Sequence, residues 1–265
     1  MKKTSNSIDS TFMTFDGHLY VFRQMLLRIF IVVLLFGILT FYCKNVTFDF
    51  ILAPSDSNFS TYIWIEQLLI ELGFDYHFEQ FQIELITTEL SGQFMTHLST
   101  SIYTSLLLSS PYILLEFFRF VSPALYKNER KVSWRIGTTM YVMFVIGLLI
   151  SYYIIFPFSV RFLGTYQVAS KVHSTITLDS YMDTFLCLSV VMGLMFQLPV
   201  VSYVLSKKDI VAYENLSKYR RHAIILIVTL SAIITPPDIL TLLLVSVPLY
   251  CLFEISLWII KTSHR

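Results

Sequence analysis

The sequence predicts an all-α polytopic membrane protein with six transmembrane helices in a single membrane domain over residues 1–265. Three observations support this fold class: 55% of the residues are hydrophobic, only 14% are charged, and the mean hydropathy is +0.66. Globular proteins average about 45 to 50% apolar and about 25% charged residues, so lipid is expected to surround most of these side chains. The composition therefore excludes a water-soluble enzyme.

Six long stretches without Asp, Glu, Lys or Arg are the candidate spans. Together with adjoining residues they predict helices at about 24–43, 96–118, 136–160, 184–206, 222–236 and 239–260. A helix rises about 1.5 Å per residue, so about 20 residues cross a hydrocarbon core of about 30 Å. The fifth stretch is shorter than that, and the sixth reaches full length only by including Glu254. We expect these two helices to be short and to form a hairpin, because the two prolines between them cannot continue a helix.

The distribution of basic residues predicts the orientation in the membrane. Sixteen of the 19 lysines and arginines fall in the two terminal segments and in the second and fourth connections, which alternate with the other three connections. The positive-inside rule therefore places both termini in the cytoplasm. The first connection, 44–95, would face outward, and its residues 44–89 contain eight carboxylates and one lysine.

Within this external acidic loop, residues 61–72 predict a short amphipathic helix. Its apolar face would consist of residues spaced three or four apart, namely Ile65, Leu68, Leu69 and Leu72. Such a helix could lie on the outer surface of the membrane or pack across the bundle. Alternatively, it could simply cap the external end of the bundle.

Catalytic and metal-binding patterns are missing from the sequence. The three cysteines lie in apolar stretches without a CxxC pair, the six histidines show no HExxH spacing, and no serine occupies a GxSxG motif. We therefore predict no enzymatic activity, no metal and no cofactor. The net charge of +1 gives no reason to expect binding to nucleic acid.

Gln197 is the main polar residue in the middle of a predicted span. A polar side chain is costly in hydrocarbon unless it faces protein or water, and a glutamine can hydrogen-bond to another helix. Two interpretations are equally consistent with this residue. It either clamps two helices of the bundle or contacts a polar group on a guest helix.

The connection 119–135 is the second candidate site. It holds one carboxylate, Glu129, among five basic residues, in a loop that Pro123 would stiffen. Glu129 could form an ion pair within an ordinary basic cytoplasmic loop. Alternatively, the protein could present it to a guanidinium ligand, because arginine and carboxylate match in a planar, bidentate geometry.

Six motifs in order resemble the TatC family, the multispanning receptor subunit of the twin-arginine protein translocase. They cover nearly the whole chain and are His18-Leu19 with Arg23, Ala53-Pro54, the run FVSPALYKNER at 120–130, FQLPV at 196–200, RRHAI at 220–224 and TPPD at 235–238. The resemblance implies a kinked, glove-like bundle with a concave face and a thinned edge at short helices 5 and 6.

The resemblance also implies a function. TatC-like proteins bind the twin-arginine signal peptide of a folded cargo on the cytoplasmic face, associate with the single-span proteins TatA and TatB, and use the proton-motive force. The matching positions imply that the signal peptide contacts Glu129, Arg23, Lys127, Phe120 and Pro123. Further positions would serve as intramembrane polar or partner contacts, namely Gln197, Asp238 and Pro54. We also expect a homo-oligomer within the receptor complex.

Several positions depart from the family pattern. Val21 stands where the family usually has a glutamate, and Met25 where it has a further arginine. Gln197 replaces another glutamate, and Leu242 replaces a common glutamine. Because Val21 cannot accept a hydrogen bond, we hypothesise that Glu129 supplies most of the charge recognition. The carboxylate of Asp16 or Glu116 would assist it.

Two rival functions remain. A small-solute secondary transporter would need charged residues near the bilayer midplane, where the sequence offers only Gln197 without a partner carboxylate. A structural scaffold would have the same spans but no specific use for Glu129. We expect the bacterial cytoplasmic (inner) membrane, because the N-terminus lacks an Arg/Ser-rich transit peptide; the alternatives are the mitochondrial inner membrane and the thylakoid.

Overall fold

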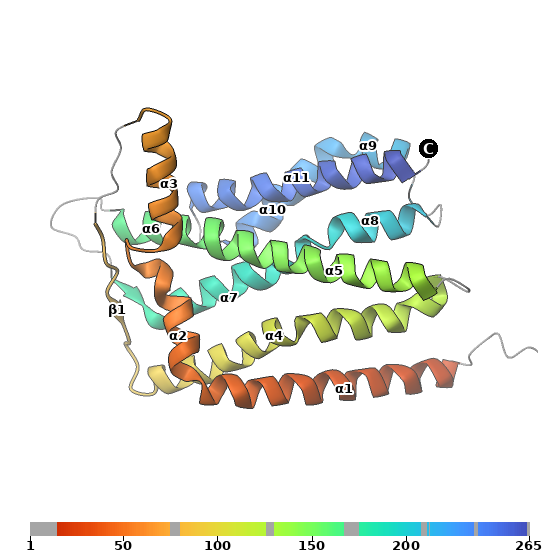
Figure 1. Cartoon of the computed structure of the whole chain (residues 1–265), viewed down its shortest axis with the longest axis horizontal. Coiled ribbons are helices and arrows are strands. Elements are labelled where there is room, and N and C mark those ends of the chain that lie inside the picture. Colours follow the sequence, from red (N-terminus) through yellow and green to blue (C-terminus); the bar gives the residue numbers. More distant parts are fainter. Residues whose placement is uncertain are drawn as a thin grey trace, which may run out of the picture.

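The computed structural model describes residues 15–74, 80–125, 130–166, 175–207, 211, 213–235 and 238–263, with backbone alone at 15, 16, 18, 121–125, 130–133, 215 and 263. Helices dominate these residues, and the long ones run alongside one another (Figure 1). The helices are α1 (Phe15–Tyr42), α2 (Lys44–Leu52), η1 (Ala53–Ser55), α3 (Ser60–Glu71), α4 (Gly92–Leu125), α5 (Arg130–Ile150), η2 (Ser151–Ile155), α6 (Phe156–Thr165), α7 (Leu178–Met195), α8 (Leu198–Ser206), α9 (Tyr213–Lys218), α10 (Arg220–Ile234) and α11 (Ile239–Ser263). Two short strands, β1 (Leu85–Ile86) and β2 (Ile176–Thr177), pair in parallel.

Five helical stretches among the described residues are long and apolar enough to cross a membrane. They are Leu19–Tyr42, Gly92–Phe120, Trp134–Thr165, Leu178–Ser206 and Ile239–Thr262. These stretches contain the predicted first, second, third, fourth and sixth spans almost entirely. The all-α membrane fold predicted from the sequence is therefore confirmed.

The last two helices differ in length from each other. Helix α10, the predicted fifth span, has 15 residues and so extends only about 22 Å, as its short apolar run indicated. Helix α11 has 25 residues, so the prediction of a short sixth helix was wrong. The physical reason is the environment of Glu254: its carboxylate lies 3.0 Å from Nη2 of Arg220 on α10 and accepts a hydrogen bond from the Tyr250 hydroxyl. A carboxylate with two partners need not end a helix.

Helix α4 extends further than expected. It reaches Leu125, so the segment 119–125 that was predicted as loop belongs to its last two turns. Pro123 has no N–H, so the backbone hydrogen bond to the carbonyl of Arg119 is missing in this last turn. Pro123 therefore lies in a helix rather than in the predicted loop.

The bundle is assembled from closely packed helix pairs: α4 lies against α1, α7 against α5, α8 against α11, and α10 against α11. Helix α1 contacts mainly α4. Only 11% of its apolar membrane-spanning stretch is buried inside the protein, so its other faces are left for lipid. Small and hydroxyl-bearing residues allow α1 and α4 to pack closely. The Thr40 hydroxyl donates to the carbonyl oxygen of Ser101 at 3.0 Å, and Gly37 faces Ser105.

The core lies where α7 meets α5, η2 and α6. Its centre is a group of aromatic rings in edge-on contact, with Phe156 5.0 Å from both Tyr181 and Phe185 between ring centroids. Two glycines bring α5 and α7 together above these rings. A Cβ atom on Gly147 would lie 2.7 Å from the carbonyl oxygen of Met192, and one on Gly193 would lie 2.6 Å from the Phe144 ring.

This close contact leads to a stability prediction. We expect Gly147→Ala to lower the free energy of unfolding by about 1 to 3 kcal/mol, because the methyl group would meet a backbone oxygen that cannot rotate away. Gly37→Ala is the matched control, since its Cβ would lie 3.7 Å from the Ser105 side chain, an ordinary contact distance. Thermal unfolding in detergent measures both. Equal stability of the two variants would contradict the packing of α5 on α7.

Helices α2 and α3 and the two strands gather at one end of the bundle, which we call the α3 end (Figure 1). Helix α1 begins and α11 ends at the opposite end, as expected if both termini face the same side. Strand β1 joins β2 through the pairs Leu85↔Ile176 and Ile86↔Thr177. The side chain of Thr96 on α4 also donates to the Asp179 carboxylate on α7. The α3 end is thus tied together by contacts between distant segments.

A helix forms in the predicted segment, as α3, but the predicted apolar face is not confirmed. Only the first turn is buried, at Thr61 and Tyr62, whereas Leu68 and Leu72 of that face are exposed. The helix runs crosswise to the long helices (Figure 1).

Candidate functional site

The first candidate site lies where α1 begins, α4 ends and α5 begins, at the end opposite α3 (Figure 1). Arg23 is exposed on the first turns of α1, and Phe120 lies on the last turns of α4. The ring of Phe120 contacts Phe22, the neighbour of Arg23, with 5.6 Å between ring centroids. Antiparallel packing of α1 on α4 therefore brings together the N-terminal motif and the motif 120–130.

The remaining residues predicted for this site are only partly described. Lys127 and Glu129 lie outside the described residues, and Pro123 is described by its backbone alone. The described chain resumes at Arg130, where α5 begins, directly after Glu129. The Asp16 side chain, one of the two proposed helpers of Glu129, also lies outside the described residues.

Glu116, the other proposed helper, forms a buried ion triad. Its side chain is only 6% exposed, and its carboxylate lies 2.9 Å from Nη1 of Arg119 and 3.7 Å from Nη1 of Arg28 on α1. The two guanidinium groups are 72% and 54% exposed. One carboxylate thus pairs with two guanidinium groups and links α1 to α4. The sequence offered one signal for this triad, the spacing of three residues between Glu116 and Arg119.

Glu116 does not take the place of the glutamate that Val21 replaces. Val21 is next to Phe22, whose ring contacts Phe120, and Glu116 lies four residues before Phe120 on α4. One helical turn, about 6 Å, therefore separates Glu116 from the level of the aromatic contact. A ligand guanidinium would have to reach past Phe120 to meet Glu116.

Gln197 lies at the break between α7 and α8 and is buried. Its Nε2 donates to the carbonyl oxygen of Met140 on α5 at 3.0 Å and to that of Gly193 at 3.4 Å. Its Oε1 has no hydrogen-bond partner among the described residues. The amide group therefore clamps α5 to the break, and its Oε1 is enclosed by protein.

A substitution distinguishes a structural role of the Gln197 amide from a role in transport. We expect Gln197→Leu to change the free energy of unfolding by about 1 kcal/mol or less, because leucine removes both the clamp and the unpaired oxygen. Thermal unfolding measures this effect, and an export assay measures function. Loss of export in a stable variant would show that the amide group has a role in transport, whereas a large loss of stability would show that the hydrogen bonds of this amide stabilise the bundle by more than about 1 kcal/mol.

Asp238 and Pro54 lie at the α3 end, far from Arg23 and Phe120. Oδ1 of Asp238 accepts the backbone N–H of Thr241 at 2.7 Å and so caps α11. Pro54 is buried in η1, and its carbonyl oxygen lies 3.2 Å from the Tyr62 hydroxyl oxygen, whose single proton is shared with the nearer carbonyl of Pro157 at 2.8 Å. The predicted site residues therefore fall into three separate places: the start of α1, the middle of the bundle and the α3 end.

Among the described residues, no group of three or more His, Cys, Asp or Glu side chains could hold a metal ion. Ion pairs among the described residues include those at Glu116 and at Glu254. The chemistry that these groups offer is noncovalent recognition by charge and hydrogen bonds.

The long apolar helices, packed side by side, define a polytopic helical membrane protein. The chain belongs to the TatC family: the family model described as "Sec-independent protein translocase protein (TatC)" matches residues 17–248. The chain is therefore a subunit of a protein translocase, a family of membrane proteins without enzymatic activity.

Curated relatives agree with this assignment. TatC of Blattabacterium sp. subsp. Periplaneta americana is 32% identical over 255 residues, which cover 93% of this chain and 94% of the relative. TatCy of Bacillus subtilis is 35% identical over 69% of this chain and 72% of its own length. TatC of Escherichia coli K12 is 30% identical over 66% and 67%, respectively.

The fold matches a crystal structure of the twin-arginine translocase receptor TatC. The match has a TM-score of 0.75 at 28% sequence identity and covers 94% of this chain and all of the other. A second crystal structure of that receptor, in the detergent DDM, matches with a TM-score of 0.73.

Proposed function

We propose that this chain is the receptor subunit of a twin-arginine translocase. It binds twin-arginine signal peptides at the cytoplasmic face. With TatA- and TatB-type partners it exports folded proteins, using the proton-motive force. The observation that carries this proposal is the contact of Phe22 with Phe120, because it places the two motifs expected to contact the signal peptide side by side in a TatC-family chain.

The roles within this site follow from residue chemistry. The carboxylate of Glu129 binds a guanidinium group of the peptide through paired, charge-assisted hydrogen bonds. Phe120 and Phe22 offer an apolar surface to the aliphatic part of an arginine side chain or to a neighbouring apolar residue. Arg23 in the N-terminal motif, and Lys127 and Pro123 in the same motif as Glu129, are the remaining contacts of the proposed binding surface.

The partner contacts lie elsewhere in the bundle. Helix α10 extends only about 22 Å, so the bilayer thins locally beside it. A single-span partner docks at this edge. Gln197 is a further partner contact, and because its Oε1 is buried, a guest helix reaches this oxygen only when the helices around it move apart. Asp238 and Pro54 shape the α3 end for such contacts. The receptor complex contains several copies of the chain, in the bacterial cytoplasmic membrane with both termini inside the cell.

An export assay in bacterial cells that lack their own TatC tests this proposal. The cells express this chain with its TatA- and TatB-type partners and a folded reporter with Arg-Arg or Lys-Lys in its signal. We expect export of the Arg-Arg reporter and retention of the Lys-Lys reporter. Equal export of both, or no export by a correctly inserted chain, contradicts the proposal. A reporter with a Sec-type signal controls for membrane integrity.

A further inference from the structure

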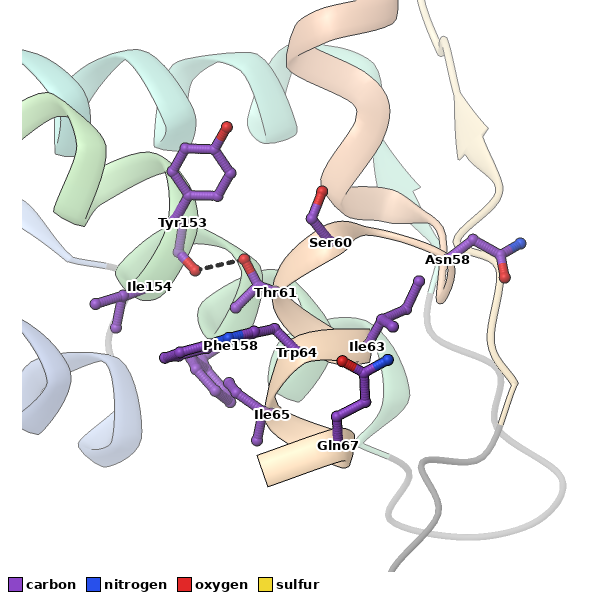
Figure 2. Close-up of a pocket in the computed structure, with 10 residues that line it drawn as sticks. All are labelled: Asn58, Ser60, Thr61, Ile63, Trp64, Ile65, Gln67, Tyr153, Ile154 and Phe158. Atoms are coloured by element: carbon purple, nitrogen blue, oxygen red, sulfur yellow. Dashed lines mark hydrogen bonds between the residues drawn. The ribbon is translucent and has the colours of Figure 1, made fainter. Parts of the chain in front are cut away.

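A cavity at the α3 end is separate from the recognition site described above. It has a volume of about 740 Å³ and lies between α3 and the segment formed by η2 and α6 (Figure 2). Aliphatic and aromatic side chains dominate its lining, with Trp64 and Ile65 from α3 and Ile154 and Phe158 from the other wall. The polar lining residues are uncharged.

Two hydrogen bonds hold the cavity open by fixing the first turn of α3. The Thr61 hydroxyl donates to the carbonyl oxygen of Tyr153 at 2.7 Å (Figure 2), and the Tyr62 hydroxyl donates to that of Pro157 at 2.8 Å. Burial raises the pKa of the Tyr62 hydroxyl, so this donor stays protonated. Beyond this turn, α3 extends away from the long helices (Figure 1).

The length of the third span places the cavity relative to the bilayer. Trp134 begins this span and is 70% exposed, as expected for an aromatic residue at a membrane interface. Twenty residues further, after about 30 Å of helix, the span reaches Ile154 in the cavity wall. The cavity therefore straddles the hydrocarbon boundary at the α3 end. Tyr153 and Trp64, both partly exposed, are aromatic residues of the kind that occupy this boundary.

The surface around the cavity is continuous with the lipid-facing wall of the span, where Leu149 and Ile154 are exposed. Asn58 and Gln67 at its rim carry amide groups that can donate to ester or phosphate oxygens. Helix α3 contains the carboxylates of Glu66 and Glu71 and no lysine or arginine. The guanidinium of Arg161 on α6 lies 5.8 Å from the centre of the Tyr62 ring on α3. Charges of both signs therefore lie beside α3 and suit a zwitterionic headgroup.

We propose that this cavity binds one zwitterionic phospholipid from the leaflet at the α3 end. An acyl chain fills the space between Trp64, Ile65, Ile154 and Phe158, and the headgroup lies at the rim of α3. The bound lipid supports α3, whose exposed apolar side chains would otherwise face water. This site is independent of signal-peptide recognition at the opposite end.

Fluorescence of Trp64 tests the proposal directly. The full chain with Trp134→Phe and Trp258→Phe keeps Trp64 as its only tryptophan and is reconstituted in phosphatidylcholine vesicles containing a rising fraction of dibrominated phosphatidylcholine. We expect half-maximal quenching of Trp64 at a roughly tenfold lower fraction than for a protein that retains only Trp258, an exposed residue on α11. Brominated phosphatidylglycerol should require a higher fraction than phosphatidylcholine.

Two cavity variants and one control complete the experiment. Ile65→Glu introduces a charge and Ile154→Phe narrows the space, and either should remove the quenching at low fraction. Val46→Glu makes the same charge change on α2 at the same end, outside the cavity lining, and should preserve it. Quenching of Trp64 that follows the Trp258 curve means ordinary bulk-lipid contact and overturns the proposal. Absence of quenching means that water or protein covers the cavity and also overturns it.

Discussion

Replacement of Glu129 by alanine is expected to weaken capture of a twin-arginine peptide by about ten- to a hundredfold. A hydrogen-bonded pair with charged groups contributes about 1.5 to 3 kcal/mol, which corresponds to that range of affinity. No compensation comes from Val21, because its side chain cannot accept a hydrogen bond. Glu116 is held by two resident arginines about one helical turn away from the Phe22–Phe120 contact.

Crosslinking of a photoreactive Arg-Arg signal peptide to membranes containing each variant measures this effect. Glu214→Ala is a matched control, since Glu214 is an exposed carboxylate on α9 among basic residues. Val21→Glu restores the family carboxylate and is expected to increase capture. Unchanged capture by Glu129→Ala would remove Glu129 from the recognition site, whereas equal loss in Glu214→Ala would indicate a general charge effect.

Removal of both arginines from the Glu116 triad is expected to destabilise the bundle by about 3 kcal/mol. Arg28→Ala with Arg119→Ala would leave a nearly buried carboxylate without a cation, and an unpaired buried charge has a cost of this size. Glu116→Ala should cost only about 1 kcal/mol, because both guanidinium groups are largely exposed and stay hydrated. Removing the two arginine side chains is thus expected to lower the free energy of unfolding more than removing the Glu116 carboxylate.

Thermal unfolding of the purified variants in detergent tests this order. Arg220→Ala provides the comparison at a more exposed pair, because the Glu254 side chain is 35% exposed and also accepts from Tyr250. Its effect should stay below about 1 kcal/mol. If Glu116→Ala proves more destabilising than the double arginine variant, the carboxylate contributes by packing rather than by charge pairing.

The membrane spans could be predicted because charged residues are rare within the hydrocarbon core and frequent where a helix leaves it. The fifth apolar run, with 16 residues, correctly indicated the short helix α10. The predicted bounds 239–260 cover most of α11, but the helix was wrongly expected to be short, because Arg220, which pairs with Glu254, lies 34 residues before it in the sequence. The extension of α4 to Leu125 was missed because a proline usually signals a helix end.

The site was predictable as a set of residues but not as an arrangement. The motifs singled out Phe120 and Arg23, yet no pattern in the sequence specifies that Phe22 meets Phe120. Gln197 was recognised as a buried polar group, but its main partner is the backbone carbonyl of Met140, which has no sequence signature. Exposure of Leu68 and Leu72 on α3 was equally unforeseen, because periodicity identifies an apolar face but not what covers it.

The parallel pairing of β1 with β2 determines where the bundle can open. These strands, together with the bond from Thr96 to Asp179, fasten the first turns of α4 and α7 to each other. If α4 rotated against α7, the two helices would therefore separate least beside the strands and most at the opposite end of the bundle, where we propose that the signal peptide binds.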